Sequence, residues 1–188
     1  MTDERAPARA QARALVLRYF RWHDGHADLA GILRDGKTLE ALGRALAEPF
    51  ADGNVCGVVA VESRGFVLGA LVARQLGVGL VLARRPGTVH PGVVRLADAG
   101  PDWRGRPVDL GVTGTAVSAG GRFLVVDDWI ETGAHARTAT ALLARLGASV
   151  VGTSVLIDGT SPDVRAALGV VGLLRADELP PDDVAPAR

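Results

Sequence analysis

The chain has 188 residues, 48% of them hydrophobic, and its 21 basic and 21 acidic residues give a formal net charge of zero. This length suits one domain with a single substantial core, and the dispersed arginines disfavour a nucleic-acid or anionic-membrane surface. The lone Cys56 excludes an intramolecular disulfide, and we expect it to be a small core residue. No apolar leader or run of about 18 apolar residues is present, so the sequence predicts a cytoplasmic protein.

The first half of the chain predicts alternating helices and strands. Residues 2–13 are polar and predict either a loose helix or disorder. Thr38 is the expected N-cap of the first regular helix. The predicted elements are a helix over 38–47, a strand over 57–61, a helix over 66–76 closed by Gly77, and a strand over 78–83. This alternation predicts a right-handed parallel sheet.

The second half begins with residues 84–121, which are rich in Gly, Pro, Arg and Asp and show apolar alternation only at 108–112. Such a stretch predicts an irregular functional loop or lid. The elements expected after it are strands over 123–126, 149–157 and 170–174, helices over 134–146 and 161–168, and a frayed polar tail over 182–188.

The most informative segment runs from Phe123 to His135, where an apolar strand ends in Asp127 and Asp128 and turns through Thr132 and Gly133 into a helix. The free N–H groups and dipole of a helix start favour an anion such as phosphate. The two carboxylates could accept hydrogen bonds from a sugar diol or face a magnesium ion. One loop would then hold a ribose 5-phosphate.

Two other interpretations of the paired acids are possible. They could simply be a polar strand end, because carboxylates are common where a strand enters solvent. A receiver domain also places paired acids after an apolar strand, but it needs a later lysine, and Lys37 is the only lysine in the chain. A dehydrogenase is disfavoured because no Gly-x-Gly-x-x-Gly follows a strand.

These residues resemble the signature of the type I phosphoribosyltransferases: a hydrophobic strand, two acids, a few variable residues and Thr-Gly. Three further segments are similar to the adenine branch of that family. They are Glu62-Ser63-Arg64-Gly65-Phe66, the run from Leu82 to Gly87 and, more faintly, the run from Gly31 to Asp35. The resemblance spans about residues 55–158.

The resemblance implies an α/β fold, a type I phosphoribosyltransferase-like parallel sheet of about five strands flanked by helices. It implies a single domain over 1–188, with a core at about 38–175 and residues 1–37 as an N-terminal extension and small hood. It also implies a catalytic set, a 5-phosphate loop and a pyrophosphate site. The catalytic set is Asp127, Asp128 and Arg64; the 5-phosphate loop is Glu131, Thr132, Gly133, Ala134, His135 and Ala136; the pyrophosphate site is Glu62, Ser63, Arg64, Gly65, Arg84 and Arg85.

The implied reaction transfers the 5-phosphoribosyl group of phosphoribosyl diphosphate to a nucleobase, a purine such as adenine, and releases pyrophosphate. Magnesium would be the cofactor, facing Asp127 and Asp128 through ligand or water. Relatives also imply a homodimer, in which Arg84 and Arg85 could reach pyrophosphate across the interface, and a cis peptide in the turn at Glu62. The alternative is a non-catalytic regulator or accessory protein that binds phosphoribosyl diphosphate.

The sequence departs from the family pattern at several positions. Glu131 stands where a small residue is usual, and we expect it to point away from the phosphate. His135 replaces a threonine and could donate to phosphate or only occupy the first helical turn. Two further departures concern the base. Arg104-Gly105-Arg106 replaces a Glu-Tyr-Gly segment, with Asp102 and Asp109 the nearest acids, and Trp22, His23 and His26 occupy the region of a Phe-Pro segment. Trp129 could be a lid, a subunit contact or packing.

Overall fold

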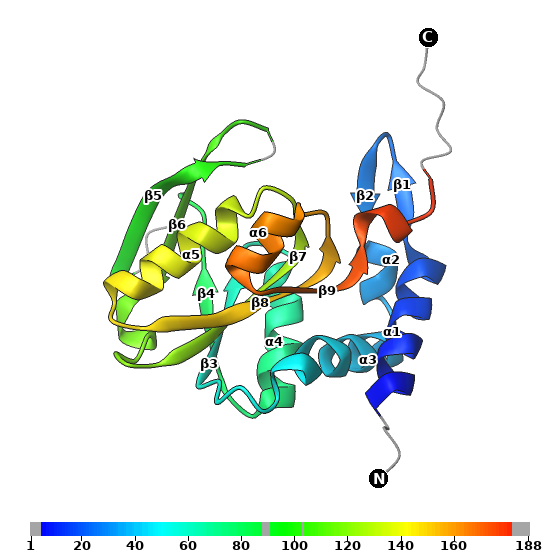
Figure 1. Cartoon of the computed structure of the whole chain (residues 1–188), viewed down its shortest axis with the longest axis horizontal. Helices are drawn as coiled ribbons and strands as arrows, with labels where there is room; N and C mark the ends of the chain where they lie inside the picture. Colours follow the sequence, from blue (N-terminus) through cyan, green and yellow to red (C-terminus); the bar gives the residue numbers. More distant parts are fainter. Residues whose placement is uncertain (1–4, 88–90, 103, 182–188) are drawn as a thin grey trace.

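A five-stranded, wholly parallel sheet forms the centre of the computed structural model, which describes residues 5–87, 91–102 and 104–181. Its strands follow the order β4-β3-β7-β8-β9, with helices on both faces (Figure 1). The strands are β3 (Gly57–Val61), β4 (Gly79–Ala83), β7 (Arg122–Ile130), β8 (Ser149–Asp158) and β9 (Val170–Arg175). The predicted fold class and strand number are confirmed.

Alternation along the central strands divides the core into two layers. Val58 and Leu124 face one side of the sheet, in the core shared with α1 (Arg5–Tyr19), α3 (Gly36–Ala47) and α4 (Gly65–Leu76). Val59 and Val125 face the other side and pack with α5 (Ala134–Arg145). All of β3 and residues 123–126 of β7 are buried, as expected for interior strands of a parallel sheet.

Capping residues set the helix boundaries. The predicted N-cap Thr38 is wrong: Asp35 caps α3 and accepts a hydrogen bond from the backbone N–H of Thr38 at 2.9 Å. Thr38 lies within the first turn, where its hydroxyl donates to the same carboxylate at 2.8 Å. Gly77 ends α4 at φ +68°, a conformation that favours glycine, and Ser161 caps α6 (Pro162–Leu168) as predicted.

The N-terminal segment forms a packed helix and a small hood. Ala12 and Val16 of α1 are fully buried, so this stretch is helical where the sequence left a loose helix or disorder open. The hood consists of the hairpin β1 (Arg21–His23) and β2 (His26–Asp28), followed by α2 (Ala30–Leu33). The N-terminal residues 1–4 and the predicted tail at 182–188 lie outside the described residues.

The prediction of an irregular loop over 84–121 is wrong for residues 93–101 and 107–113. Strands β5 (Val93–Pro101) and β6 (Pro107–Thr113) form an antiparallel ribbon that leans on α5 (Figure 1). Leu110 and Val112 are buried in the α5 core layer, and a long unpaired loop would leave its backbone groups without partners. Arg84 joins the ribbon to the sheet through two 2.8 Å hydrogen bonds with Gly111.

Cys56 is exposed, so its predicted core role is wrong. It lies just before β3, at the amino-terminal edge of the sheet, and its Sγ accepts a hydrogen bond from the N–H of Arg122 at 3.1 Å. Three short 3-10 turns complete the fold at Glu48–Phe50, Gly114–Ala116 and Ala176–Glu178. Across the part of the chain that the structure describes, no helix is long and apolar enough to cross a membrane.

Candidate active site

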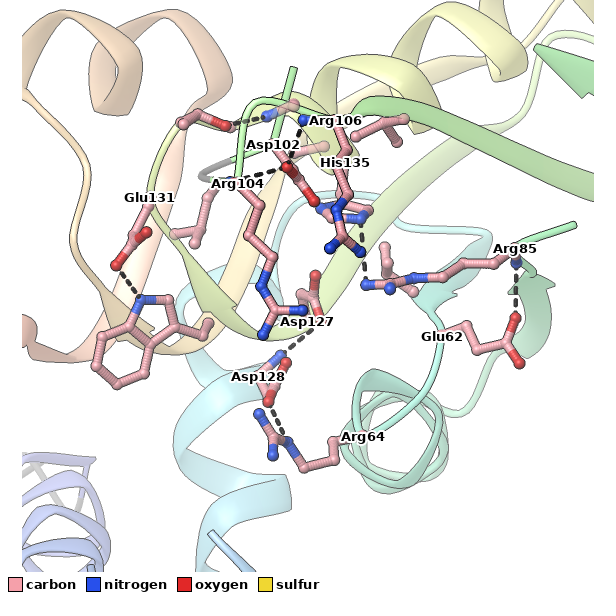
Figure 2. A pocket seen from close by; sticks show the side chains of 18 of the residues that line it. Glu62, Arg64, Arg85, Asp102, Arg104, Arg106, Asp127, Asp128, Glu131 and His135 are labelled. Atoms are coloured by element: carbon pink, nitrogen blue, oxygen red, sulfur yellow. Dashed lines mark hydrogen bonds and ion pairs between the residues drawn. The ribbon is translucent and has the colours of Figure 1, made fainter. Parts of the chain in front are cut away.

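A pocket of about 650 Å³ opens at the carboxyl ends of β3, β4 and β7. Residues that follow these strands form its floor, and the tip of the β5–β6 ribbon and the hood hairpin form its walls. Figure 2 shows that side chains from distant parts of the sequence point into this space. Ligands of open α/β sheets bind at such an edge, because helix N-termini and strand ends meet there.

The acidic pair at the end of β7 forms the centre of the floor. The Asp127 carboxylate accepts a hydrogen bond from the backbone N–H of Asp128 at 2.8 Å. Burial, with a further contribution from the neighbouring Asp128 carboxylate, raises the pKa of Asp127 well above its usual range. Gly65 packs against this carboxylate so closely that a Cβ there would lie 3.0 Å from Asp127 Oδ1. A second negative charge beside Asp128 is therefore unfavourable, and a cation or a hydrogen-bond donor of a ligand would offset that cost.

The turn after β3 brings a cation to the acidic pair. Arg64 forms an ion pair with Asp128 through its Nε, and 48% of the Arg64 side chain is exposed toward the pocket mouth. The Glu62–Ser63 peptide bond is cis, as expected from the resemblance. Glu62 turns toward the end of β4, where its carboxylate accepts a hydrogen bond from the Arg85 backbone N–H at 2.6 Å.

The two arginines after β4 separate. Arg85 lines the pocket, whereas the Arg84 guanidinium lies over the Phe66 ring at 5.1 Å. Of the remaining predicted pyrophosphate residues, Glu62 and Arg64 also line the pocket; Ser63, Gly65 and Arg84 are outside its described lining. The structure thus brings Glu62, Arg64 and Arg85 together beside the acidic pair.

The predicted 5-phosphate loop curves into the start of α5. Gly133 adopts φ +74°, and a Cβ there would lie 2.6 Å from Leu168 Cδ1, so both conformation and space require glycine. The Thr132 hydroxyl donates to the Pro101 carbonyl at 3.2 Å and accepts a hydrogen bond from the backbone N–H of Ala134 at 3.3 Å. The first N–H groups of a helix lack intrahelical acceptors, so this loop can receive an anion.

The two unusual loop residues point in different directions. The Glu131 carboxylate accepts a hydrogen bond from the Trp129 indole N–H at 3.2 Å, on the exposed side of the loop (Figure 2). His135 faces the pocket, and its Nε2 lies 3.4 Å from an Arg85 guanidinium nitrogen. Burial first, and then the charge of Arg85, lower the pKa of His135, although Asp102 and Asp128 oppose the shift.

Trp22 and Trp129 form the hood side of the pocket. Their rings meet edge to face at 6.2 Å, and Trp22 stacks in the same manner on Phe20 at 5.0 Å. The indole N–H of Trp22 donates to the Pro180 carbonyl at 2.8 Å, which fixes the ring. His26 also lines this side, whereas His23 faces Asp28 at 3.5 Å and is outside the described lining.

The tip of the β5–β6 ribbon covers the pocket with charged residues. Asp102 accepts hydrogen bonds from the backbone N–H groups of Arg104 and Arg106, each at 2.9 Å. The hydrogen bond from Arg106 is the largest cause of the lowered pKa of Asp102. Asp109 is paired with Arg95 at 3.1 Å. Figure 2 shows the Arg104 side chain extending from the tip toward Asp127. Both predicted substitute acids therefore lie at the pocket.

Sequence reasoning missed Arg137, whose guanidinium donates to the Thr132 carbonyl at 2.5 Å and braces the loop. A signal was available, because a cation in the first turn of a helix opposes the helix dipole unless it has a partner. The contact between Thr132 and Pro101 carried no signal, since the two residues are far apart in the sequence.

A family model described as "Phosphoribosyl transferase domain" matches residues 32–171. The chain belongs to this family. It is 36% identical over 156 residues to the adenine phosphoribosyltransferase of Methylobacterium sp. (strain 4-46), with 81% of this chain and 80% of that protein covered.

Solved structures agree with this membership. The adenine phosphoribosyltransferase of Rhodothermus marinus superposes with a TM-score of 0.75 at 28% identity, covering 88% of this chain and 99% of that one. The Saccharomyces cerevisiae enzyme, solved with an imino-altritol bisphosphate and adenine, gives a TM-score of 0.73 at 25% identity and covers 88% and 99%. The predicted family, fold and enzyme class are confirmed, and no support emerges for the non-catalytic regulator.

Proposed function

We propose that this phosphoribosyltransferase transfers the 5-phosphoribosyl group from phosphoribosyl diphosphate to adenine or a closely related purine, releasing pyrophosphate. One observation carries the proposal. The acidic pair of β7, the N-terminus of α5 and the arginine-bearing turn after β3 line the same pocket. The acidic pair can bind a sugar, the helix N-terminus a phosphate and the arginine a diphosphate. The relatives of this chain are adenine phosphoribosyltransferases.

In the proposed reaction, a base nitrogen attacks C1 of the ribose while the bond from C1 to the diphosphate oxygen breaks. The ribose ring carries positive charge in the transition state, so catalysis depends on positioning and electrostatics. Asp127 and Asp128 would hold the ribose hydroxyls, and their negative charge would stabilise the cationic ring. Arg64 and Arg85 would balance the charge that develops on the departing diphosphate.

The 5-phosphate would bind between Thr132 and Ala136. The helix N-terminus supplies N–H donors, and Gly133 allows the chain to turn into α5 at a positive φ against Leu168 and Val164. The Glu131 carboxylate, which also lines the pocket, accepts its hydrogen bond from the Trp129 indole and not from the N–H groups of the loop. Phosphate binding would therefore meet little repulsion from this unusual residue.

Magnesium is the cofactor we propose, and the donor set fits one mode of binding it. Among the described residues, no cluster of three or more His, Cys, Asp or Glu could form a cage. Magnesium typically binds through one or two carboxylates, substrate phosphate oxygens and water, and Asp127 with Asp128 can supply the carboxylates. When bound, the ion would neutralise charge on the diphosphate leaving group.

The acceptor base would lie against the tryptophans of the hood side. Trp22, fixed by its bond to Pro180, offers an aromatic edge to a planar heterocycle. Asp102 would replace the glutamate of the Glu-Tyr-Gly segment that this chain lacks. The other nearby acid, Asp109, is already paired with Arg95. Its lowered pKa keeps Asp102 ionised at neutral pH, so it can accept a hydrogen bond from a base N–H.

A two-fold dimer is the quaternary state that we propose. Val67 of α4 and Leu80 of the edge strand β4 are 42% and 37% exposed, which supports an apolar contact with a second copy. Arg84, which lies over Phe66, would then be available to a neighbour's site. A monomeric mass by light scattering would contradict the dimer. The cytoplasmic location stays a prediction.

The deciding experiment is a pyrophosphate-release assay with magnesium, phosphoribosyl diphosphate and a panel of purine and pyrimidine bases. We expect turnover to be fastest with adenine. Turnover only with another base would keep the transferase activity and correct the acceptor. Thermal unfolding with phosphoribosyl diphosphate and magnesium should give a higher Tm, because the ligand binds only the folded state. The absence of both turnover and a Tm shift would contradict the proposed function.

A further inference from the structure

The contact between Arg85 and His135 joins the two anion-binding sides of the pocket. Arg85 follows β4 and His135 lies in the first turn of α5, 50 residues later. Their closest nitrogens, Arg85 Nη2 and His135 Nε2, are 3.4 Å apart. A guanidinium can only donate, so the imidazole Nε2 must be the acceptor and therefore carries no proton in this arrangement.

Arg85 is anchored at its other end. Its backbone N–H donates to the Glu62 carboxylate at 2.6 Å, which ties it to the turn that carries Arg64. Its side chain extends across the pocket and meets His135 (Figure 2). A long, exposed arginine otherwise samples many rotamers, and fixing one at both ends lowers the entropy that it loses on binding an anion.

The charges around His135 come from three elements. Arg85 disfavours a second positive charge there, whereas Asp102 at the ribbon tip and Asp128 at the end of β7 favour one. Burial adds to the effect of Arg85, and together they lower the pKa of His135. The neutral imidazole therefore predominates at neutral pH, which matches its role as an acceptor.

We propose that neutral His135 is a positioning residue that holds the Arg85 guanidinium between the turn after β3 and the α5 phosphate loop, where it binds the diphosphate of the substrate. The ligand in this inference rests on the proposed function. The opposite arrangement would have an imidazolium donating directly to a phosphate. The two arrangements predict opposite effects of acidification, because protonation destroys an acceptor but creates a donor.

The contact itself is testable without any ligand. The pH titration of the His135 ring by NMR should give a higher pKa in Arg85→Gln than in the wild type, because the substitution removes a neighbouring cation. Arg74→Gln is the matched control, since Arg74 is exposed on α4 and absent from the groups that shift His135. An unchanged titration in Arg85→Gln would overturn the contact.

The consequence is measured by calorimetric titration of phosphoribosyl diphosphate with magnesium. At about pH 8, His135→Ala should weaken binding about three- to tenfold, the range expected for one lost hydrogen bond. His135→Gln, whose amide oxygen can accept from Arg85, should restore most of that loss. His135→Ala should add little in an Arg85→Ala background, because the two residues act as one unit.

The direction in which acidification changes the affinity decides between the two arrangements. The ratio of wild-type affinity to His135→Gln affinity cancels the titration of the ligand, and we expect it to fall between about pH 8 and about pH 5.5 as the imidazole is protonated. A rising ratio would overturn the inference in favour of an imidazolium ligand. If the wild type does not bind phosphoribosyl diphosphate, the proposed function and the ligand role of Arg85 both fail, and the NMR result still reports on the contact.

Discussion

Two neighbouring strands of the sheet, β7 and β8, carry aspartates near their carboxyl ends that are held in opposite ways. Asp127 of β7 lies beside the like charge of Asp128, and burial raises its pKa well above the usual range. Asp158 of β8 is buried too, but its carboxylate binds Arg165 and Arg175, each at 2.7 Å. Burial opposes the ionisation of Asp158, yet hydrogen bonds from Thr160 and the two arginines outweigh it and lower the pKa.

The difference separates a carboxylate that supports the fold from one available to a ligand. Thr160 donates its N–H and its hydroxyl to Asp158 at 2.8 and 2.5 Å, so this charge is compensated within the protein. Beside the β7 pair, Arg64 forms an ion pair with Asp128 and is half exposed at the pocket. A buried carboxylate next to a like charge costs stability, and binding sites commonly carry such a cost.

Removing Asp158 should give the largest effect. Asp158→Ala leaves Arg165 and Arg175 without their acid and should lower the free energy of unfolding by about 3–5 kcal/mol. Chemical denaturation measures this change. Asp163→Ala is the control, because Asp163 is exposed on α6, and it should stay within about 0.5 kcal/mol. A loss below about 1 kcal/mol for Asp158→Ala would erase the contrast between the two strand ends.

The acidic pair should matter for the reaction and not for folding. Asp127→Asn combined with Asp128→Asn should lower turnover at least about a hundredfold, because it removes charge at the developing cation. The Tm shift caused by phosphoribosyl diphosphate with magnesium should disappear as well. Circular dichroism should remain that of the wild type, and loss of folding in this variant would instead indicate a structural role.

Asp127 alone should oppose stability at neutral pH. A carboxyl with a raised folded-state pKa favours folding below its unfolded pKa, and stability falls as pH rises through the folded pKa. Asp127→Asn removes that loss and should add about 1 kcal/mol near pH 8, or roughly 2–4 °C in Tm. The gain should vanish in acid, where the wild-type carboxyl is protonated. The contribution of Asp158 has the opposite sign: it stabilises the folded protein at neutral pH, and this stabilisation is lost as pH falls through the lowered pKa of Asp158.

Glu131 should show the smallest effect, because its carboxylate faces Trp129 and not the phosphate loop. Glu131→Ala should change the affinity for phosphoribosyl diphosphate by less than about threefold, or under about 1 kcal/mol. Calorimetric titration measures this, with Glu131→Gln as the variant that keeps the acceptor for the indole. A large gain in affinity for Glu131→Ala would mean that the carboxylate repels the phosphate. Glu131 would then add to the negative charge of the β7 pair at the binding site.

The sequence by itself determined the strands of the central sheet, the helices between them and the loop that carries Asp127, Asp128, Thr132 and Gly133. Uninterrupted apolar runs, helical periodicity and capping residues are local signals, and β3 and α6 follow them closely. The family resemblance rested on the same local motifs. The expectation that Glu131 points away from the phosphate came from a local argument, the repulsion between two negative groups; in the structure its carboxylate contacts the Trp129 indole at the pocket wall.

Tertiary structure decided which charges became partners. Arg84 and Arg85 are adjacent and chemically identical, yet only the second lines the pocket among the described residues, because Gly111 pairs with the backbone of the first. The ribbon over 93–113 formed because β6 could bury Leu110 beneath α5, which no local pattern specifies. Asp158 of β8 pairs with Arg175 of the neighbouring strand β9, and Asp128 of β7 pairs with Arg64 in the turn after β3. Such pairings depend on how separate segments meet in space, and that geometry is set by the packed fold as a whole.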